Sequence, residues 1–147
     1  MDPERAVAFD RKFGRWFYPV HRRLYRLTGG FIGHRSPAGP MLLLTTTGRR
    51  TGELRTTPLL YMPDGDAVIV VGSNGGRDQP PGWLLNLEAH PVARIQVGPR
   101  RNPVKASVLR GPDAAPLWPR LVDHYAGWGH YRTLTDREIP VVRLTPT

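Results

Sequence analysis

Short apolar runs alternate with polar turn residues over most of the chain, which is typical of β-strands rather than of long helices. Residues 63–66, Pro-Asp-Gly-Asp, give a strong hairpin-turn signal between two such runs. Residues 67–72 are almost entirely apolar, so we expect this strand to be buried on both faces. The predicted strands are residues 41–47, 54–61, 67–72, 92–97, 104–110 and 139–144.

Helical periodicity is confined to three parts of the chain. In residues 3–27 apolar side chains recur every three or four positions, and arginines occupy the remaining surface. Residues 83–89 predict a short helix, and a third helix is expected from a cap at Asp113 to about Tyr125. Residues 28–39, with several Gly and Pro, predict a linker.

Six short strands in hairpin order, with two or three helices, predict an α+β fold: a closed antiparallel β-barrel with helices packed on its outside. Closure would remove the edges that such short strands otherwise expose. A length of 147 residues suits a single domain. We therefore expect a basic amphipathic helix and linker in residues 1–39, followed by the barrel in residues 40–147.

The chain has a formal net charge of +9, with 19 arginines and two lysines. A GC-rich genome would explain the preference for arginine over lysine, but it does not explain the net excess of cations. That excess predicts an acidic partner, which can be nucleic acid, anionic lipid, or a ligand with phosphate or carboxylate groups.

The chain contains no cysteine, which excludes disulfides, thiolate metal sites, iron–sulfur clusters and thiol catalysis. No stretch reaches the roughly 18–20 apolar residues of a membrane span. Residues 3–27 also lack the apolar core of a secretory signal. These features predict a cytoplasmic protein.

The most strongly charged motif is the turn at residues 48–55, Gly-Arg-Arg-Thr-Gly-Glu-Leu-Arg. Three guanidinium groups so close together repel one another unless an anion is bound. Arginine binds phosphate oxygens two at a time, and free backbone N–H groups at glycines add to the cradle. The spacing differs from that of a P-loop. The alternative is an exposed hairpin whose arginines are solvated.

Two further segments are candidates for a ligand site. Residues 71–77, Val-Gly-Ser-Asn-Gly-Gly-Arg, open a strand into small side chains, which lets the backbone approach a flat ligand. Tyr125, Trp128 and Tyr131 recur at a spacing of three, so they share one side if the segment is helical. The alternatives are an ordinary glycine-rich loop and ordinary core packing.

Several other chemistries lack their motifs. The five histidines do not pair at metal-ligand spacing and no H-E-x-x-H occurs, so no metal site is expected. The G-x-S-x-G and G-x-G-x-x-G motifs are also absent. If the chain is an enzyme, we therefore expect the reactive atom to belong to a cofactor.

Residues 42–52, Leu-Leu-Leu-Thr-Thr-Thr-Gly-Arg-Arg-Thr-Gly, and residues 55–59, Arg-Thr-Thr-Pro-Leu, resemble the signature of the deazaflavin-dependent nitroreductase family. Members of this family use coenzyme F-420, an 8-hydroxy-5-deazaflavin with a phosphate and a polyglutamate tail. The resemblance extends in order over residues 40–146. Its further motifs are Gly72-Ser73, residues 83–87, residues 90–92 and residues 135–142.

The resemblance implies a split β-barrel of the flavin-reductase or FMN-binding kind, with flanking helices. It also implies that the phosphate and tail of F-420 lie near Arg50, Thr51 and Arg55. The residues implied to line the deazaflavin are Thr57, Pro58, Val71, Gly72, Ser73, Asn74, Trp83 and Asn86.

The implied reaction is hydride transfer from the reduced deazaflavin to an organic acceptor such as a quinone or a nitro compound. Ser73, Tyr125 and Tyr131 match catalytic positions, where a hydroxyl would donate a hydrogen bond to charge that develops on the acceptor. Tyr125, Trp128 and Tyr131 match the pocket that binds the substrate.

Three positions depart from the family pattern. Arg50 stands where the best-known members have lysine, and it should still bind phosphate. Asn74 replaces a cation, which removes one contact to the phosphate or tail. Trp128 replaces a tyrosine of the substrate pocket, which bears on which nitroaromatic compound is accepted.

The resemblance also suggests partners. Reduction of a membrane quinone would give residues 3–27 a role at the inner face of the plasma membrane, and the alternative is a helix that caps the barrel. The polyglutamate tail explains the cationic excess better than nucleic acid does, so no nucleic-acid partner is expected. The sequence leaves a homodimer open. The other functions considered are an F-420-binding or storage protein without significant turnover, an FMN- or haem-binding barrel, and an arginine-rich nucleic-acid binder.

Overall fold

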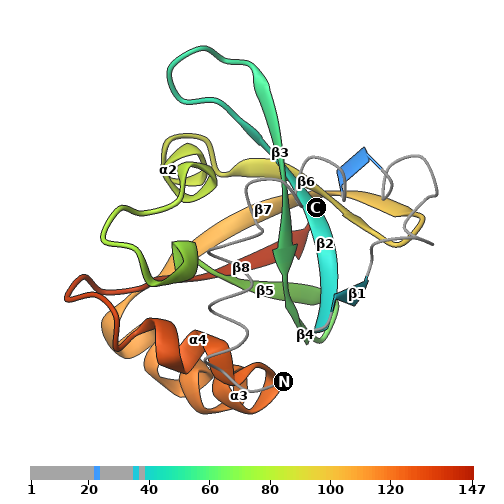
Figure 1. Cartoon of the computed structure of the whole chain (residues 1–147). Helices are drawn as coiled ribbons and strands as arrows, with labels where there is room; N and C mark the ends of the chain where they lie inside the picture. Colours follow the sequence, from blue (N-terminus) through green and yellow to red (C-terminus); the bar gives the residue numbers. More distant parts are fainter. Residues whose placement is uncertain (1–21, 24–34, 37–38) are drawn as a thin grey trace.

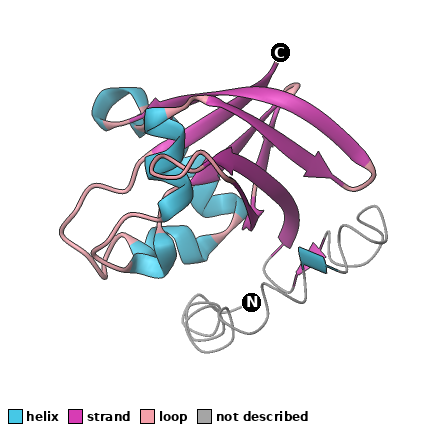
Figure 2. Ribbon diagram, turned by 90° about the horizontal axis from the view of Figure 1, so that it is seen from above, coloured by secondary structure: helices cyan, strands magenta, loops and turns pink. Residues whose placement is uncertain are grey.

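The computed structural model describes residues 22–23, 35–36 and 39–147, in which a curled antiparallel sheet has the helices gathered at one side (Figures 1 and 2). The strands are β1 (Arg35–Ser36), β2 (Gly39–Thr47), β3 (Leu54–Leu60), β4 (Met62–Asp64), β5 (Ala67–Val71), β6 (Val92–Val97), β7 (Arg100–Leu109) and β8 (Val141–Pro146). The helices are α2 (Gly82–Ala89), α3 (Trp118–His124) and α4 (Ala126–Tyr131), and the 3₁₀ turns are η1 (Asn74–Gly76), η2 (Gly111–Asp113) and η3 (Ala115–Leu117).

The strands follow the order β1-β2-β6-β7-β8-β5-β4, and β3 pairs with β2 off this path. Only Tyr61 separates β3 from β4, so one stretch of chain pairs with β2 along its first part and with β5 along its last. The α+β split barrel is confirmed. The closed barrel is wrong in one respect. Among the described strands, no ladder pairs β4 with β2, and the two ends of the sheet are connected only by the continuous segment of β3 and β4. Pro58 and Pro63 lie in it, and proline suits an edge because it has no N–H to donate.

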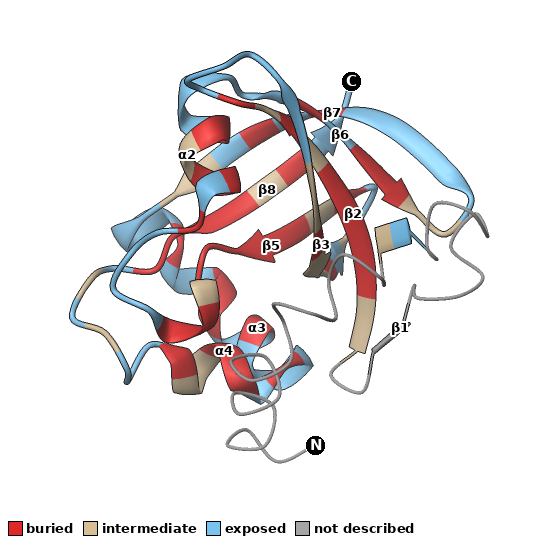
Figure 3. Ribbon diagram, turned by 45° about the horizontal axis from the view of Figure 1, so that its top comes forward, coloured by how far each residue is buried: buried red, intermediate tan, exposed pale blue. Residues whose placement is uncertain are grey.

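Two apolar clusters stabilise the sheet, one inside the curl and one outside it (Figure 3). Leu42 and Leu44 of β2 point inward, where α2 closes one end with Trp83 and Leu87. The outer cluster packs α3 and α4 against β5. Residues of β5 enter both clusters, so the prediction that this strand is buried on both faces is confirmed.

The helix predicted from Asp113 to Tyr125 is wrong as a single element. Two 3₁₀ turns precede α3, which begins at Trp118, and Asp113 makes no capping hydrogen bond. Pro116 and Pro119 explain the break, because proline lacks the N–H that a helix interior requires. Tyr125 is extended, with φ −150°, and separates α3 from α4.

The hairpin of β6 and β7 is tighter than the sequence predicts. Residues 98–103 were expected as its loop, but β7 begins at Arg100 and pairs there with Val97. Gly98 permits the turn with φ +60°. Arg100 and Arg101 therefore lie in the sheet, where successive side chains point to opposite faces.

Most of the N-terminal prediction lies outside the described residues. Of the helix expected in residues 3–27, only Arg22 and Arg23 are described, and both are helical. The short strand β1 forms within the expected linker, residues 28–39. None of the described helices has the length and apolar character needed to cross a bilayer.

Candidate functional site

The turn between β2 and β3 projects from the barrel and is fixed by its two glycines (Figure 1). Gly48 N donates to Glu53 O at 2.7 Å, and Gly52 N donates to Gly48 O at 2.8 Å. A Cβ on Gly48 would lie 2.9 Å from Glu53 O, and Gly52 has φ +73°. Larger residues would strain both positions, so the turn presents its arginines from a defined backbone.

Asn86 of α2 anchors this turn to the barrel. Its side chain is 5% exposed, and Oδ1 accepts hydrogen bonds from Arg49 N and from Arg49 Nη1, both at 3.1 Å. Its Nδ2 donates to Thr46 Oγ1 at 3.1 Å. The sequence predicts Asn86 as a residue that lines the cofactor and counts Arg49 among the three arginines of the turn, but it does not predict the contacts of Asn86 with Arg49 and Thr46. The structure gives Asn86 the task of positioning the turn, and its contact with a cofactor stays a prediction.

The residues predicted to bind phosphate lie on the exposed side of this turn. In the described part of the chain, Arg50 forms no ion pair or hydrogen bond. Thr51 Oγ1 accepts from Glu53 N at 3.2 Å, which leaves its O–H able to donate. Arg55 pairs with Glu53 at 3.2 Å, with side chains 59% and 67% exposed. Such an exposed pair is weak, so an anionic ligand can displace it.

Thr57 and Pro58 lie on β3, which pairs only with β2 among the described strands. Thr57 pairs with Leu44 of the inner face, and Pro58 pairs with Leu43, whose side chain points to the opposite face. A flat ligand can therefore contact both residues only along the edge of β3 that faces away from β2, which pairs with no other described strand. Backbone groups at such an edge form hydrogen bonds with groups outside the sheet, as Thr56 O does when it accepts from Arg22 Nη1 at 2.9 Å.

Ser73 carries the strongest sign of a ligand site in the loop after β5. Its side chain is 7% exposed, yet Oγ forms no hydrogen bond in the described part of the chain. A buried hydroxyl without a partner costs about 1–3 kcal/mol. Gly72, which precedes it, would place a Cβ 3.0 Å from Leu84 of α2, so the loop packs closely on that helix. The residues present here fit a bound ligand that pairs with the Ser73 hydroxyl.

Asn74 holds the remainder of the loop in place. It adopts φ +47°, a left-handed conformation that asparagine tolerates. Its Nδ2 donates to Gln79 O at 2.8 Å, and its Oδ1 accepts from Arg77 Nη1 at 3.5 Å. The cation that the family has at this position is absent, but the guanidinium of Arg77 lies at the same loop.

Arg137 was missed by the sequence analysis, and it fixes the loop from the opposite side. Its Nη2 donates to Gly72 O at 3.1 Å and to Ser73 O at 2.9 Å, and its Nε donates to Arg77 O at 3.0 Å. Burial lowers the pKa of Arg137, and the neighbouring Asp78 carboxylate opposes this shift. Arginine stays charged at neutral pH even so, and this one orients the carbonyls around Ser73.

Tyr125, Trp128 and Tyr131 lie together, as the spacing of three predicts. They are buried in the outer cluster with Val71, and the two tyrosine hydroxyls are 3.4 Å apart. The rings of Tyr125 and Trp128 meet edge to face, with centroids 5.4 Å apart. A Cβ on Gly127 would overlap the Tyr125 ring, so this glycine, also missed, sets the position of that ring. Their contacts with a substrate stay a prediction.

Contacts between neighbouring elements link these parts into one region. Asn86 joins the turn to α2, Gly72 packs on α2, and a Cβ on Gly76 would lie 3.2 Å from Tyr131 O of α4. Trp83 of α2 is 7% exposed and belongs to the inner cluster. No group of three metal-ligating side chains occurs among the described residues. The fold and the site define a split-barrel protein whose exposed arginines fit an anionic ligand.

Comparisons with known proteins agree with this class. The model of the F420H(2)-dependent quinone reductase family matches residues 17–146. An F420H(2)-dependent quinone reductase of Mycobacterium tuberculosis is 45% identical over 149 residues, which cover 99% of each chain.

Two solved structures are also similar. An F420-H2 dependent reductase (FDR-A) is 34% identical with a TM-score of 0.65, and the match covers 71% of this chain and 93% of that one. A protein described as a domain-swapped dimer is 30% identical with a TM-score of 0.68, over 85% and 96%. This chain belongs to the F420H(2)-dependent quinone reductase family, and the family resemblance inferred from its sequence is confirmed.

Proposed function

We propose that this protein is an F-420-dependent reductase that transfers a hydride from the reduced deazaflavin to a quinone or a related organic acceptor. Membership of the F420H(2)-dependent quinone reductase family supports this activity. The observation that carries the proposal in the structure is an anchored, arginine-rich turn that shares one region with Ser73, a buried residue whose hydroxyl has no hydrogen-bond partner among the described residues.

Each part of the site has a separate task in this proposal. When bound, reduced F-420 supplies two electrons and a proton as a hydride. Arg50, Thr51 and Arg55 would hold its phosphate and acidic tail through charge-assisted hydrogen bonds. The contacts of Asn86 fix the turn before the ligand arrives, which lowers the ordering cost of binding.

The loop after β5 would act on the acceptor. The Ser73 O–H is buried and can donate to oxygen atoms on which negative charge develops. The hydroxyls of Tyr125 and Tyr131 lie at the neighbouring helix and can supply a second donor. The apolar cluster around them excludes water from the reacting groups.

We predict that Arg55→Ala weakens F-420 binding by about 1.5–3 kcal/mol, because one charge-assisted contact is lost. Quenching of the cofactor fluorescence in a titration measures the dissociation constant. Arg110→Ala is the matched control, since Arg110 is also exposed and paired with a glutamate, Glu88. An affinity that Arg55→Ala leaves unchanged would remove this arginine from the site.

We predict that Ser73→Ala slows acceptor-dependent oxidation of reduced F-420 about tenfold, because one hydrogen bond in the transition state is lost. The stability of the free protein should not fall, since the hydroxyl has no hydrogen-bond partner among the described residues. Steady-state kinetics and thermal unfolding measure the two effects, and Ser107→Ala on the exposed side of β7 is the control. An unchanged rate combined with lower stability would assign Ser73 a purely structural role.

A storage protein without turnover is separated from an enzyme by the same assay. The enzyme oxidises reduced F-420 only when a quinone is present, whereas a storage protein binds the cofactor and leaves it reduced. Two further expectations also belong to this proposal. A homodimer is supported by a similar protein that is described as a domain-swapped dimer. The membrane contact of residues 3–27 rests on the sequence alone.

A further inference from the structure

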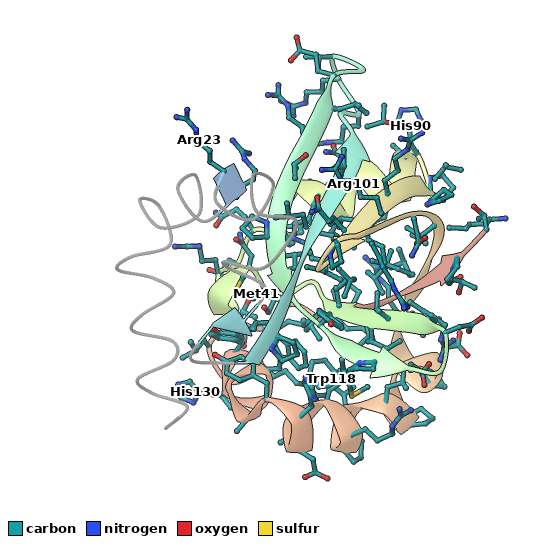
Figure 4. The ribbon with its side chains drawn as sticks, turned by 90° about the vertical axis from the view of Figure 1, so that its right-hand side faces the viewer. Arg23, Met41, His90, Arg101, Trp118 and His130 are labelled. Atoms are coloured by element: carbon teal, nitrogen blue, oxygen red, sulfur yellow. The ribbon has the colours of Figure 1, made fainter. Side chains whose placement is uncertain are left out.

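A pocket of about 310 Å³ opens on the outer face of the barrel. Figure 4 looks onto this side of the molecule and labels Arg101 there. The candidate cofactor site does not use these side chains. The residues that line the pocket are Leu43, Thr45, Thr56, Arg94, Ile95, Gln96 and Arg101.

The strand register places the polar residues of this pocket on one face. Thr45 pairs with Thr56 on β3 and with Arg94 on β6. Gln96, two residues after Arg94, pairs with Arg101 on β7. Cross-strand partners share a face, and so do residues two apart in a strand. These five side chains therefore point outward together.

The pocket faces away from Arg55, one of the two arginines assigned to the cofactor. Arg55 precedes Thr56 on β3 and pairs with Thr46, whereas Thr56 pairs with Thr45. Successive side chains of a strand point to opposite faces. Arg55 and the pocket therefore lie on opposite sides of the β2–β3 hairpin, and one ligand group cannot contact both.

The charges of the pocket are not balanced. Arg94 and Arg101 are exposed, and in the described part of the chain neither forms an ion pair or a hydrogen bond. None of the described residues that line the pocket is acidic. A third guanidinium lies close by, because Arg22 Nη1 donates to Thr56 O at 2.9 Å. Like charges on neighbouring strands repel one another unless an anion lies between them.

The donors match the chemistry of a phosphate group. Guanidinium groups bind tetrahedral oxyanions through two N–H groups at a time. The hydroxyls of Thr45 and Thr56 form a hydrogen bond with each other at 2.9 Å, which uses one of the two O–H groups, and a hydroxyl group can add a neutral donor to a phosphate site. The volume lies at the small end of the range for ligand pockets. We propose that this pocket binds a phosphate group, either as free phosphate or as a small phosphomonoester, independently of F-420.

A titration of the full chain with sodium phosphate, followed through backbone amide resonances, tests this proposal. We expect saturable shifts for residues 45, 56, 94–96 and 101. In the double variant R94Q/R101Q we expect the affinity for phosphate to fall by about tenfold or more. R100Q is the matched control for the loss of one charge. Arg100 is exposed, is adjacent to Arg101, and points to the other face of β7. A parallel titration with glycerol phosphate shows whether free phosphate or a phosphomonoester binds more tightly.

Two results would overturn the proposal. The first is that sodium chloride at the same ionic strength produces the same shifts, which would indicate general screening. The second is that R100Q weakens phosphate binding as much as R94Q/R101Q does. Phosphate bound at the β2–β3 turn would shift residues 49–55 instead, so the pocket and the proposed F-420 site are tested separately in one experiment.

Discussion

Replacing Arg137 with alanine is expected to lower the free energy of unfolding by about 2–4 kcal/mol and to weaken F-420 binding about tenfold. The guanidinium donates to the carbonyls of Gly72, Ser73 and Arg77, and two of these residues are buried. Without it, the carbonyls of Gly72, Ser73 and Arg77 each lose a charged donor. The loop that orients Ser73 would then be released.

Chemical denaturation and fluorescence titration measure the two effects of Arg137→Ala. Arg132→Ala is the control, because Arg132 is exposed and only stacks on Trp118, with its Cζ 4.1 Å from the ring centroid. We expect that variant to lose less than about 1 kcal/mol and to bind F-420 normally. Arg137→Lys should fall between the wild type and Arg137→Ala, because an ammonium group cannot reach all three carbonyls at once. A stable Arg137→Ala variant with full affinity would show that the loop holds its own conformation.

Asn86→Ala is expected to destabilise the fold by about 2–3 kcal/mol and to weaken F-420 binding about tenfold. The amide group makes three hydrogen bonds that join α2 to β2 and to the turn. Its loss leaves Thr46 Oγ1 buried without this donor and lets Arg49 swing away. The turn would then become ordered only when the ligand binds, and the loss of conformational entropy would lower the affinity.

The control for Asn86→Ala is Asn102→Ala, since Asn102 is exposed on β7. Thermal unfolding and the same titration should leave the control unchanged. If Asn86→Ala lowers stability but not affinity, the anchor serves the fold alone. If it lowers affinity without affecting stability, Asn86 contacts the cofactor directly, as the sequence-based prediction states.

Features with a local signal could be predicted from the sequence. The glycines at 48 and 52 indicate the turn, because the backbone conformation at each position disfavours any residue with a Cβ. Residues 67–72 predict a strand buried on both faces, because a continuous apolar run can be read from the sequence without knowing which strands pair with it. The common side of Trp128 and Tyr131 follows from helical spacing, whereas Tyr125 joins them as the extended residue that precedes α4.

Features that depend on distant contacts could not be predicted. Arg137 and Ser73 are 64 residues apart, and Asn86 and Thr46 are 40 apart, so no local pattern joins them. Arg137 lies in residues 135–142, which the family resemblance includes, but no local feature of that segment indicates its contact with the loop after β5. The single bridging segment of β3 and β4 was also hidden, because pairing with two different strands is a property of the sheet and not of the segment.

The central claim is that the turn between β2 and β3 binds the anionic part of F-420 and so places the ring beside Ser73. A crystal structure of the complex with F-420 tests this claim most directly. We predict phosphate or tail oxygens within hydrogen-bond distance of Arg50 and Arg55, with the deazaflavin against the free edge of β3 and the Ser73 hydroxyl paired. A complex in which the coenzyme lies elsewhere, and these arginines face only solvent, would contradict it.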